Sequence, residues 1–487
     1  MRVFAAAVLV FPTLLAVAAG GPRNIKLRGY ITELRSQNSF DIDDYRVSRE
    51  STLSLEFEKD EEAGSEVELP GDLRIGSEVE IKGEYDTESH QLTARSIKIF
   101  PGDTRKVKRT AILETPPRLE RHGTAWSGTL RADGQLLVVD EDSKLSIVAN
   151  RTQSKAEKSA AKAAKQAAKN GEPIEPTSVP LGRPDDVHAN MYVSYEGARE
   201  QSGSIRVAKA EFKDNERTSG EAKLWKSLTP KVTAFKTDRP GEVRIAGVGK
   251  FKTIPNDDVQ QYVRRLATQL LPANQRELPD GNENKIPLQV FVIEQKVPNA
   301  SALPNGTVLV HSALFPALEN EAQLAFVLGH EIAHATQEHT QRQLEFHKKK
   351  RMALQIAAIA ASAYGAYNLR DILHLISSAI TNGYQRGLEN QADRLGMEYM
   401  LNAGYDPREA PRAWKTMSLK YGDAPTNFFW SSHDNNATRR SFLMAELRNN
   451  YPETDFATTK RDSDDFHRIS QMMTDQQRGK QKIKVKY

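Results

Sequence analysis

Two histidines four residues apart, with a glutamate directly after the first, are the side chains of this chain best suited to chemistry. They stand in the segment His330-Glu331-Ile332-Ala333-His334. Residues at i and i+4 of a helix share one face, so both imidazoles can bind one zinc ion. Glu331 then lies beside the ion, where a carboxylate takes the proton of a metal-bound water. The spacing predicts a zinc peptidase site, with His330 and His334 as ligands and Glu331 as the base.

Catalytic zinc usually takes a third protein ligand and leaves one position for water. Glu389 is the candidate for this ligand, and Asp393 follows it by one helical turn on the same predicted face. Asp393 is then placed to accept a hydrogen bond from the outer nitrogen of a ligand histidine and to fix the orientation of that ring. The sequence therefore predicts a carboxylate ligand with a supporting carboxylate behind it.

Two helices must bring these residues together. Residues 321–337 repeat apolar side chains at helical spacing without a proline, which predicts a buried amphipathic helix. A second helix around Glu389 is expected to end at Gly404. Ahead of the first helix, residues 288–293 and 307–311 have strand character. They are expected either to present an edge to an extended substrate or to form a plain hairpin.

The order of these motifs resembles a metallopeptidase family that includes HtpX, BepA and the CAAX prenyl endopeptidase. After the zinc pentad and the Glu389–Asp393 pair comes a segment with His433 and then Arg439, and the similarity covers roughly residues 256–451. The resemblance implies that His433 contacts the substrate or the open side of the metal, and that Arg439 supports the site. The chain departs from the family at Asp434, where a proline is common.

For the zinc site itself, the resemblance implies the same three ligands and the same base as the spacing does. The remaining histidines of this region lack a partner pattern, and we expect them to be surface or packing residues: His311, His339, His347 and His374.

Composition bounds the other possibilities. A chain of 487 residues should contain roughly two to four domains. The net charge of +4 gives no argument for a nucleic-acid partner, and none is expected. Because the chain has no cysteine, disulfides, thiol catalysis and cysteine-ligated zinc are excluded.

The first residues predict export. Arg2 precedes an apolar run that ends in the small residues Ala16-Val17-Ala18, as in a secretory signal peptide. The alternative is an uncleaved membrane anchor, for which the proline at position 12 is unfavourable. With the family resemblance, the expected location is the bacterial periplasm.

Two stretches of the amino-terminal half look alike. Residues 73–99 and 187–212 each read as a strand, a turn and a second strand. We therefore expect tandem small β-barrels of OB-like type. Neither shows a basic groove with interleaved aromatic residues, so a spacer or docking role is favoured over nucleic-acid or sugar binding.

The sequence as a whole predicts a multidomain α+β protein. Two OB-like modules precede a mainly helical, zincin-type metallopeptidase domain with a small edge sheet. Lysine-rich segments in the second module and at the end of the chain are either solvated or in contact with an anionic membrane surface. The expected boundaries are a signal peptide at 1–19, β modules at 24–115 and 120–215, a lysine- and alanine-rich insertion at 154–172, the peptidase domain at 230–470 and a basic tail at 471–487.

The expected function is that of an exported zinc-dependent endopeptidase. Misfolded or unassembled envelope proteins are the substrates that the resemblance implies. Two alternatives remain open: a latent peptidase that acts mainly as a chaperone-like binding protein, and a thermolysin-like secreted peptidase, which also pairs HExxH with ExxxD.

Overall fold

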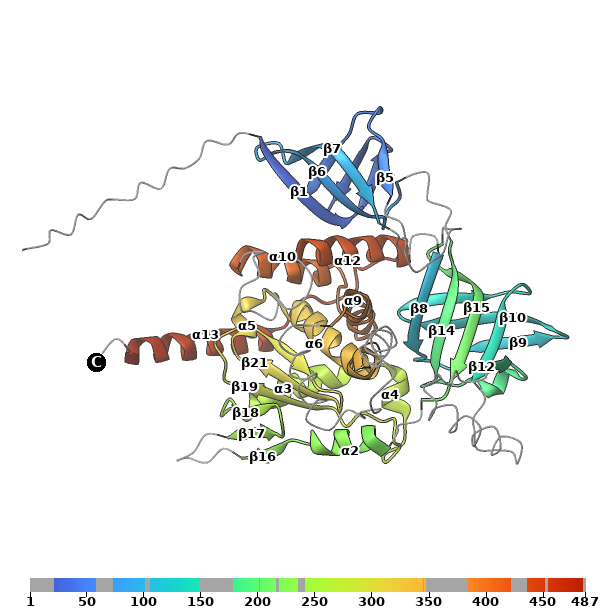
Figure 1. Ribbon diagram of the computed structural model, residues 1–487. Helices are drawn as coiled ribbons and strands as arrows, with labels where there is room; N and C mark the ends of the chain where they lie inside the picture. The colour runs from blue at the N-terminus through green and yellow to red at the C-terminus, as the bar shows by residue number, and fades with distance from the viewer. Residues whose placement is uncertain are drawn as a thin grey trace, which may run out of the picture.

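The chain folds into a mixed α+β architecture, in which two β-sheet modules precede a helical carboxy-terminal region (Figure 1). The signal peptide predicted at 1–19 and the insertion predicted at 154–172 lie outside the described residues. No helix among the described residues is long and apolar enough to cross a membrane. The computed structural model describes residues 22–57, 73–100, 106–148, 178–200, 202–215, 219–234, 241–344, 346, 384–421, 436–451 and 454–484.

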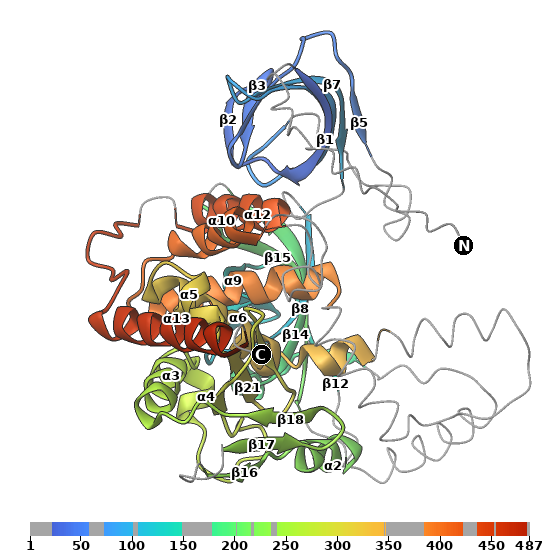
Figure 2. The same ribbon diagram turned by 90° about the vertical axis from the view of Figure 1, so that its left-hand side faces the viewer.

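The first β module is a seven-stranded, strongly curved sheet (Figure 2). Its order is β1-β6-β7-β4-β3-β2, with β5 paired to β7. Side chains alternate between the two faces of a strand, and Ile81 and Leu92 belong to the buried set of this module. The strands are β1 (Arg23–Tyr30), β2 (Glu33–Ser36), β3 (Ser39–Ile42), β4 (Tyr45–Ser48), β5 (Leu55–Phe57), β6 (Glu78–Asp86) and β7 (Gln91–Ile99).

The second β module is an eight-stranded sheet with a separate core that includes Tyr195 and Phe212. Its order is β13-β12-β15-β11-β10-β9, and β14 joins β15 to β8. The strands are β8 (Lys106–Ile112), β9 (Arg118–His122), β10 (Ala125–Ala132), β11 (Gln135–Val139), β12 (Lys144–Val148), β13 (Ser178–Pro180), β14 (Tyr192–Arg199) and β15 (Ile205–Lys213).

Both modules contain the predicted strand–turn–strand unit, as the antiparallel pairs β6–β7 and β14–β15. Each hairpin changes register next to a glycine, Gly83 in the first and Gly197 in the second. A Cβ atom would lie 2.2 Å from a backbone oxygen at Gly83 and 2.3 Å from one at Gly197, so both bulges need glycine. Between the described strands no pairing closes either sheet, and the OB-like barrel stays a prediction.

The small sheet of the carboxy-terminal region is not the plain hairpin that was one of the two alternatives. Strands β19 (Gln289–Ile293) and β21 (Thr307–His311) are confirmed, but they pair in parallel. The chain between them forms β20 (Ala300–Ala302), which is antiparallel to β21 and lies at the edge of the sheet. Of the two alternatives the plain hairpin is wrong, because no strand pattern in the sequence marks these three small residues. A further sheet of β16 (Lys231–Thr233), β17 (Glu242–Ile245) and β18 (Gly249–Lys252) precedes it.

The two predicted helices are α6 (Glu321–Thr336) and α9 (Arg386–Asn402). Every residue of α6 is buried, so this helix is enclosed on all sides rather than amphipathic. After α9 the chain turns at Gly404, whose φ of 84° is in the left-handed region.

Helices α6 and α9 touch at two glycines. A Cβ atom on Gly329 would lie 2.9 Å from the Gly396 oxygen, and one on Gly396 would lie 2.7 Å from the His330 nitrogen. The two backbones are therefore in direct contact, which brings α9 side chains up to the histidines of α6.

Helices α3, α5, α10, α12 and α13 share one apolar core with this pair. Helix α13 runs across the predicted start of the basic tail, with Met473 buried in that core. The bounds are α2 (Ser219–Ser227), α3 (Asp257–Gln269), α4 (Ala273–Glu277), α5 (Leu314–Ala317), α10 (Glu409–Tyr421), α12 (Asn436–Asn450) and α13 (Asp464–Lys484).

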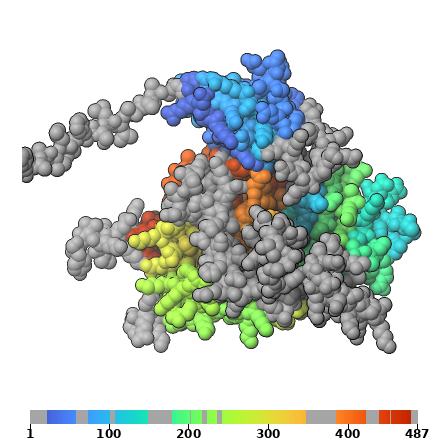
Figure 3. Space-filling model, viewed as in Figure 1, coloured from blue at the N-terminus to red at the C-terminus, as the bar shows by residue number. Residues whose placement is uncertain are grey.

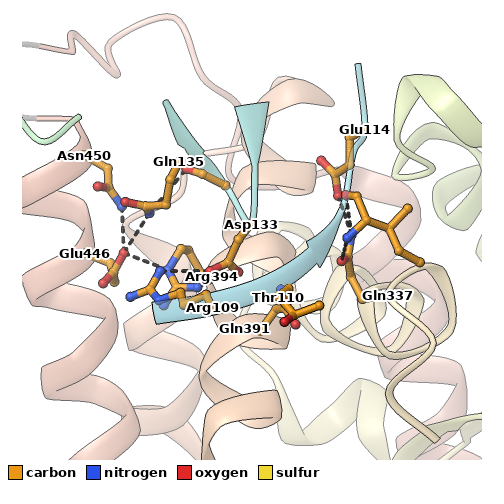
Figure 4. A network of polar contacts seen from close by, with 12 residues as sticks. Arg109, Thr110, Glu114, Asp133, Gln135, Gln337, Gln391, Arg394, Glu446 and Asn450 are labelled. Carbon is orange, nitrogen blue, oxygen red and sulfur yellow. Dashed lines mark hydrogen bonds and ion pairs between the residues drawn. The ribbon is translucent and has the colours of Figure 1, made fainter. Parts of the chain in front are cut away.

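Both β modules rest on these helices, at separate parts of the face seen in Figure 3. The first contacts the start of α12, where Ser441 Oγ accepts a hydrogen bond from the Tyr30 amide at 3.0 Å. The second contacts α9 and the end of α12 through buried charges, in which Arg394 lies 2.6 Å from Asp133 and 3.0 Å from Glu446 (Figure 4).

Candidate metal centre

Three side chains from α6 and α9 converge on one point. The Nε2 atoms of His330 and His334 lie 3.0 Å apart, and Glu389 Oε2 lies 3.5 Å and 3.9 Å from them. Atoms about 2.1 Å from a shared tetrahedral metal ion stand about 3.4 Å from one another. The three donors therefore fit a metal ion at their centre, and all three residues are buried.

The helices explain this convergence. His330 and His334 are one turn apart on α6, so their rings point the same way. Glu389 lies two turns before the glycine contact on α9, and its other oxygen accepts a hydrogen bond from the Tyr384 amide at 2.9 Å. That bond turns Oε2 toward the histidines.

Behind His330 lies a buried carboxylate. Asp393 Oδ1 is 3.0 Å from His330 Nδ1, and Arg439 Nε donates to Asp393 Oδ2 at 2.8 Å. The Arg439 guanidinium also lies 3.7 Å above the Trp414 ring, where a cation is favoured. Burial alone would raise the pKa of Asp393, but Arg439 and His330 together outweigh it and lower that pKa, so the carboxylate stays ionised.

Glu331 is held from the edge of the small sheet. Its Oε2 accepts a hydrogen bond from the Ala302 amide of β20 at 2.8 Å. Its Oε1 is buried with no hydrogen-bond partner among the described residues. Burial raises the pKa of Glu331 to about 7, a value that suits proton transfer near neutral pH. One oxygen is thus fixed by the sheet edge, and the other is buried without a hydrogen bond among the described residues.

The charges around His330 favour a cation. Burial and Arg439 would each lower the pKa of this histidine. The hydrogen bonds to Asp393 and Glu389, together with the negative charge of Asp393, outweigh both and raise the pKa to about 9. Two carboxylates beside one imidazole favour positive charge at this place.

The neighbours of His334 differ from those of His330, and the sequence did not predict them. Its ring stacks on Tyr384 with centroids 4.3 Å apart, and its Nδ1 lies 2.8 Å from Nδ1 of His339. His339, which was expected at the surface or in packing, is fully buried, and it packs against a site histidine. The sequence does not indicate that His339 lies beside His334, because Glu338, with a φ of 52°, breaks the helical spacing between them.

The other predicted residues are placed as follows. His433, His347 and His374 lie outside the described residues. His311 is half-buried at the end of β21, and its Nδ1 is 2.8 Å from the Val297 oxygen. Arg439 is connected to the site by its hydrogen bonds to Asp393.

Comparison with known proteins relates part of the sequence to a family. The model of peptidase family M48 matches residues 254–447, which hold α6, α9 and most of α12. These residues are therefore similar to an M48 peptidase domain. Members of this family are metallopeptidases, and the three converging donors lie within the matched residues.

Curated relatives are similar to this chain over about a third of its length. A putative beta-barrel assembly-enhancing protease of Vibrio cholerae is 32% identical over 174 residues, 34% of each chain. The beta-barrel assembly-enhancing protease of Escherichia coli is 29% identical over 158 residues, 31% of each chain. A mitochondrial metalloendopeptidase OMA1 of Arabidopsis thaliana is 28% identical over 159 residues, 32% of this chain and 31% of the relative. The chain thus spans about a third of the length of these relatives.

Proposed function

We propose that the protein is a zinc-dependent endopeptidase, with His330, His334 and Glu389 as the metal ligands. The convergence of their three donor atoms within 4.8 Å carries this proposal. Two imidazoles and one carboxylate form a ligand set typical of catalytic zinc, which keeps a further position for water.

The mechanism follows from the residues around the ligands. Zinc, when bound, polarises the scissile carbonyl and lowers the pKa of a water. Glu331 takes a proton at Oε1 and delivers it to the leaving amine, while the Ala302 amide holds its Oε2 in place. Asp393 fixes the His330 ring so that Nε2 faces the ion.

Arg439 is assigned a supporting role rather than contact with the substrate. Its guanidinium is 1% exposed, is paired with Asp393 and is stacked on Trp414. His433 remains the candidate for contact with the substrate or with the open side of the metal, on the family resemblance alone.

Substrates are proposed to be misfolded or unassembled envelope proteins, after export of the chain. The support is the predicted signal peptide and the names of the bacterial relatives, which refer to beta-barrel assembly. The domain division, with OB-like barrels at 24–115 and 120–215 and a peptidase domain at 230–470, belongs to the same proposal.

The test compares the full chain with Glu331→Gln. We expect about one zinc per chain in both, and cleavage of an unfolded protein by the wild type only, because glutamine accepts no proton. A matched control is Glu319→Gln, on the segment just before α6 and outside the site. Equal cleavage by wild type and Glu331→Gln would contradict the mechanism, and absence of zinc from the wild type would contradict the site.

A second candidate is a latent peptidase that acts mainly by binding. The observation that favours it is burial, since none of the four central residues is more than 3% exposed. In that case Glu331→Gln and wild type would bind an unfolded client equally well, and neither would cleave it.

A further inference from the structure

The two site histidines differ in what holds their outer nitrogens. His330 Nδ1 faces the carboxylate of Asp393 at 3.0 Å. His334 Nδ1 faces another imidazole, that of His339, at 2.8 Å. A histidine ligand usually donates its second N–H to a carboxylate, a carbonyl or water. An imidazole such as that of His339 is therefore an unusual acceptor for His334.

From His339 the contacts continue out of the peptidase domain. Its Nε2 lies 3.0 Å from Gln391 Oε1, and Gln391 Nε2 donates to the Thr110 carbonyl at 3.3 Å. Thr110 belongs to β8, and Figure 4 shows it beside Gln391 of α9. A continuous path therefore joins a predicted metal ligand to the backbone of the second β module.

The donors and acceptors along this path agree with one another. When Nε2 of His334 is a ligand, its proton is on Nδ1 and is donated to Nδ1 of His339. His339 then carries its proton on Nε2 and donates to Gln391 Oε1. Arg342 also donates to that oxygen, and since arginine only donates, the amide must be oriented with its NH2 group toward Thr110. Each group in the path has one consistent role.

The second module also holds the turn that places His339. Glu338, between α6 and His339, has a φ of 52°, which is costly for a residue other than glycine. Its carboxylate accepts hydrogen bonds from the Tyr192 hydroxyl of β14 and from Asn215 Nδ2 at 3.3 Å. Packing alone would need neither these bonds nor the consistent donor path, and His339 is fully buried at its end.

We propose that His339 is a positioning residue of the metal centre, and that the second β module is part of this centre through Thr110, Tyr192 and the turn at Glu338. The inference rests on the proposed function, since it assumes a metal ion on His334. It assigns to this module a role in metal binding, beyond that of a spacer.

The experiment measures metal affinity of the full chain, with Zn²⁺ in competition with a chelator and with Co²⁺ by absorption. His339→Leu should bind either metal about 10–100-fold more weakly and shift the Co²⁺ bands. His339→Asn should recover most of the affinity, because its side-chain oxygen can accept the His334 proton. His311→Leu is the matched control, since His311 is also partly buried and bonded to a carbonyl, and it should stay within about twofold.

The part played by the second module is tested with Tyr192→Phe, which removes the hydroxyl from Glu338. We expect about fivefold weaker metal binding, the effect of one hydrogen bond. Tyr85→Phe is the control, because it removes a tyrosine hydroxyl bonded to His90 in the first module.

The outcomes separate the inference from the function beneath it. Metal binding by the wild type with no change in His339→Leu would overturn the role of His339. A loss in His339→Leu without any loss in Tyr192→Phe would overturn the role of the module. A wild type that binds no metal would overturn the proposed function and the inference together.

Discussion

The two β modules share a bulged hairpin, yet they meet the peptidase domain in different ways. One helix, α9, shows this with two arginines. Arg386 reaches Glu78 of the first module and is 40% exposed, whereas Arg394 reaches Asp133 of the second and is 3% exposed. Exposed ion pairs contribute little, but breaking a buried one leaves an uncompensated charge. The second module is thus joined to the domain mainly by a cluster of buried charges, whereas the first combines a buried ion pair, Arg440 with Asp43, with partly exposed ones.

The buried contact of the second module with α9 also includes Glu446, which forms an ion pair with Arg394. Burial alone would raise the pKa of this carboxyl. Arg394 and Arg199, with smaller contributions from Arg109 and Asn450, outweigh that effect and lower the pKa to about 2. Arg199 comes from the second module and Arg394 from the peptidase domain, so charges from both parts stabilise one carboxylate.

The largest expected effect comes from Arg394→Ala. Asp133 and Glu446 would lose their shared buried partner, and we expect the free energy of unfolding to fall by about 3 kcal/mol. Arg386→Ala, two turns away on the same helix, should cost no more than about 1 kcal/mol. Urea unfolding of the full chain measures both. Equal losses would mean that the two modules are attached alike.

An intermediate effect is expected from Gly29→Ala, at the contact of the first module with α12. The added Cβ would lie 2.7 Å from Ile42 Cγ2 and 2.9 Å from Ser441 Oγ. Overpacking of this kind costs about 2 kcal/mol. Gly387→Ala is the control, because no atom lies within 4 Å of its Cβ position on α9. Thermal unfolding should show a loss for Gly29→Ala only, and an unchanged Gly29→Ala would mean that this contact is loose.

The smallest effect should come from Lys415→Ala. This lysine forms an ion pair of 2.6 Å with Asp44 of the first module, but the two side chains are 45% and 55% exposed. Such pairs contribute at most about 0.5 kcal/mol, and added salt weakens them further. A loss above about 1 kcal/mol in chemical unfolding would show that the first module depends on surface charge after all.

The sequence predicts those parts of this molecule whose residues follow a local period. His330 and His334, and likewise Glu389 and Asp393, are four residues apart on unbroken helices, so their shared faces can be read directly. The two hairpins alternate at a period of two and were predicted for the same reason.

Other parts depend on breaks in the period or on distant partners. His339 turns back to His334 only because Glu338 is left-handed. Strand β20 has three small residues without a strand pattern of their own, and it exists because β21 lies beside it. Arg394 and Asp133 are 261 positions apart, so no local rule pairs them.

The contact of α6 with α9 sets a condition for any attempt to transplant this site. Gly329 and Gly396 hold no metal and move no proton, but each leaves the space that the other backbone occupies. A designer who copied only the histidines and carboxylates onto another pair of helices would keep the helices about 8–10 Å apart, as ordinary side chains require. Glu389 would then stop short of the histidines. The smallest portable version of this centre therefore includes two residues with no side chain.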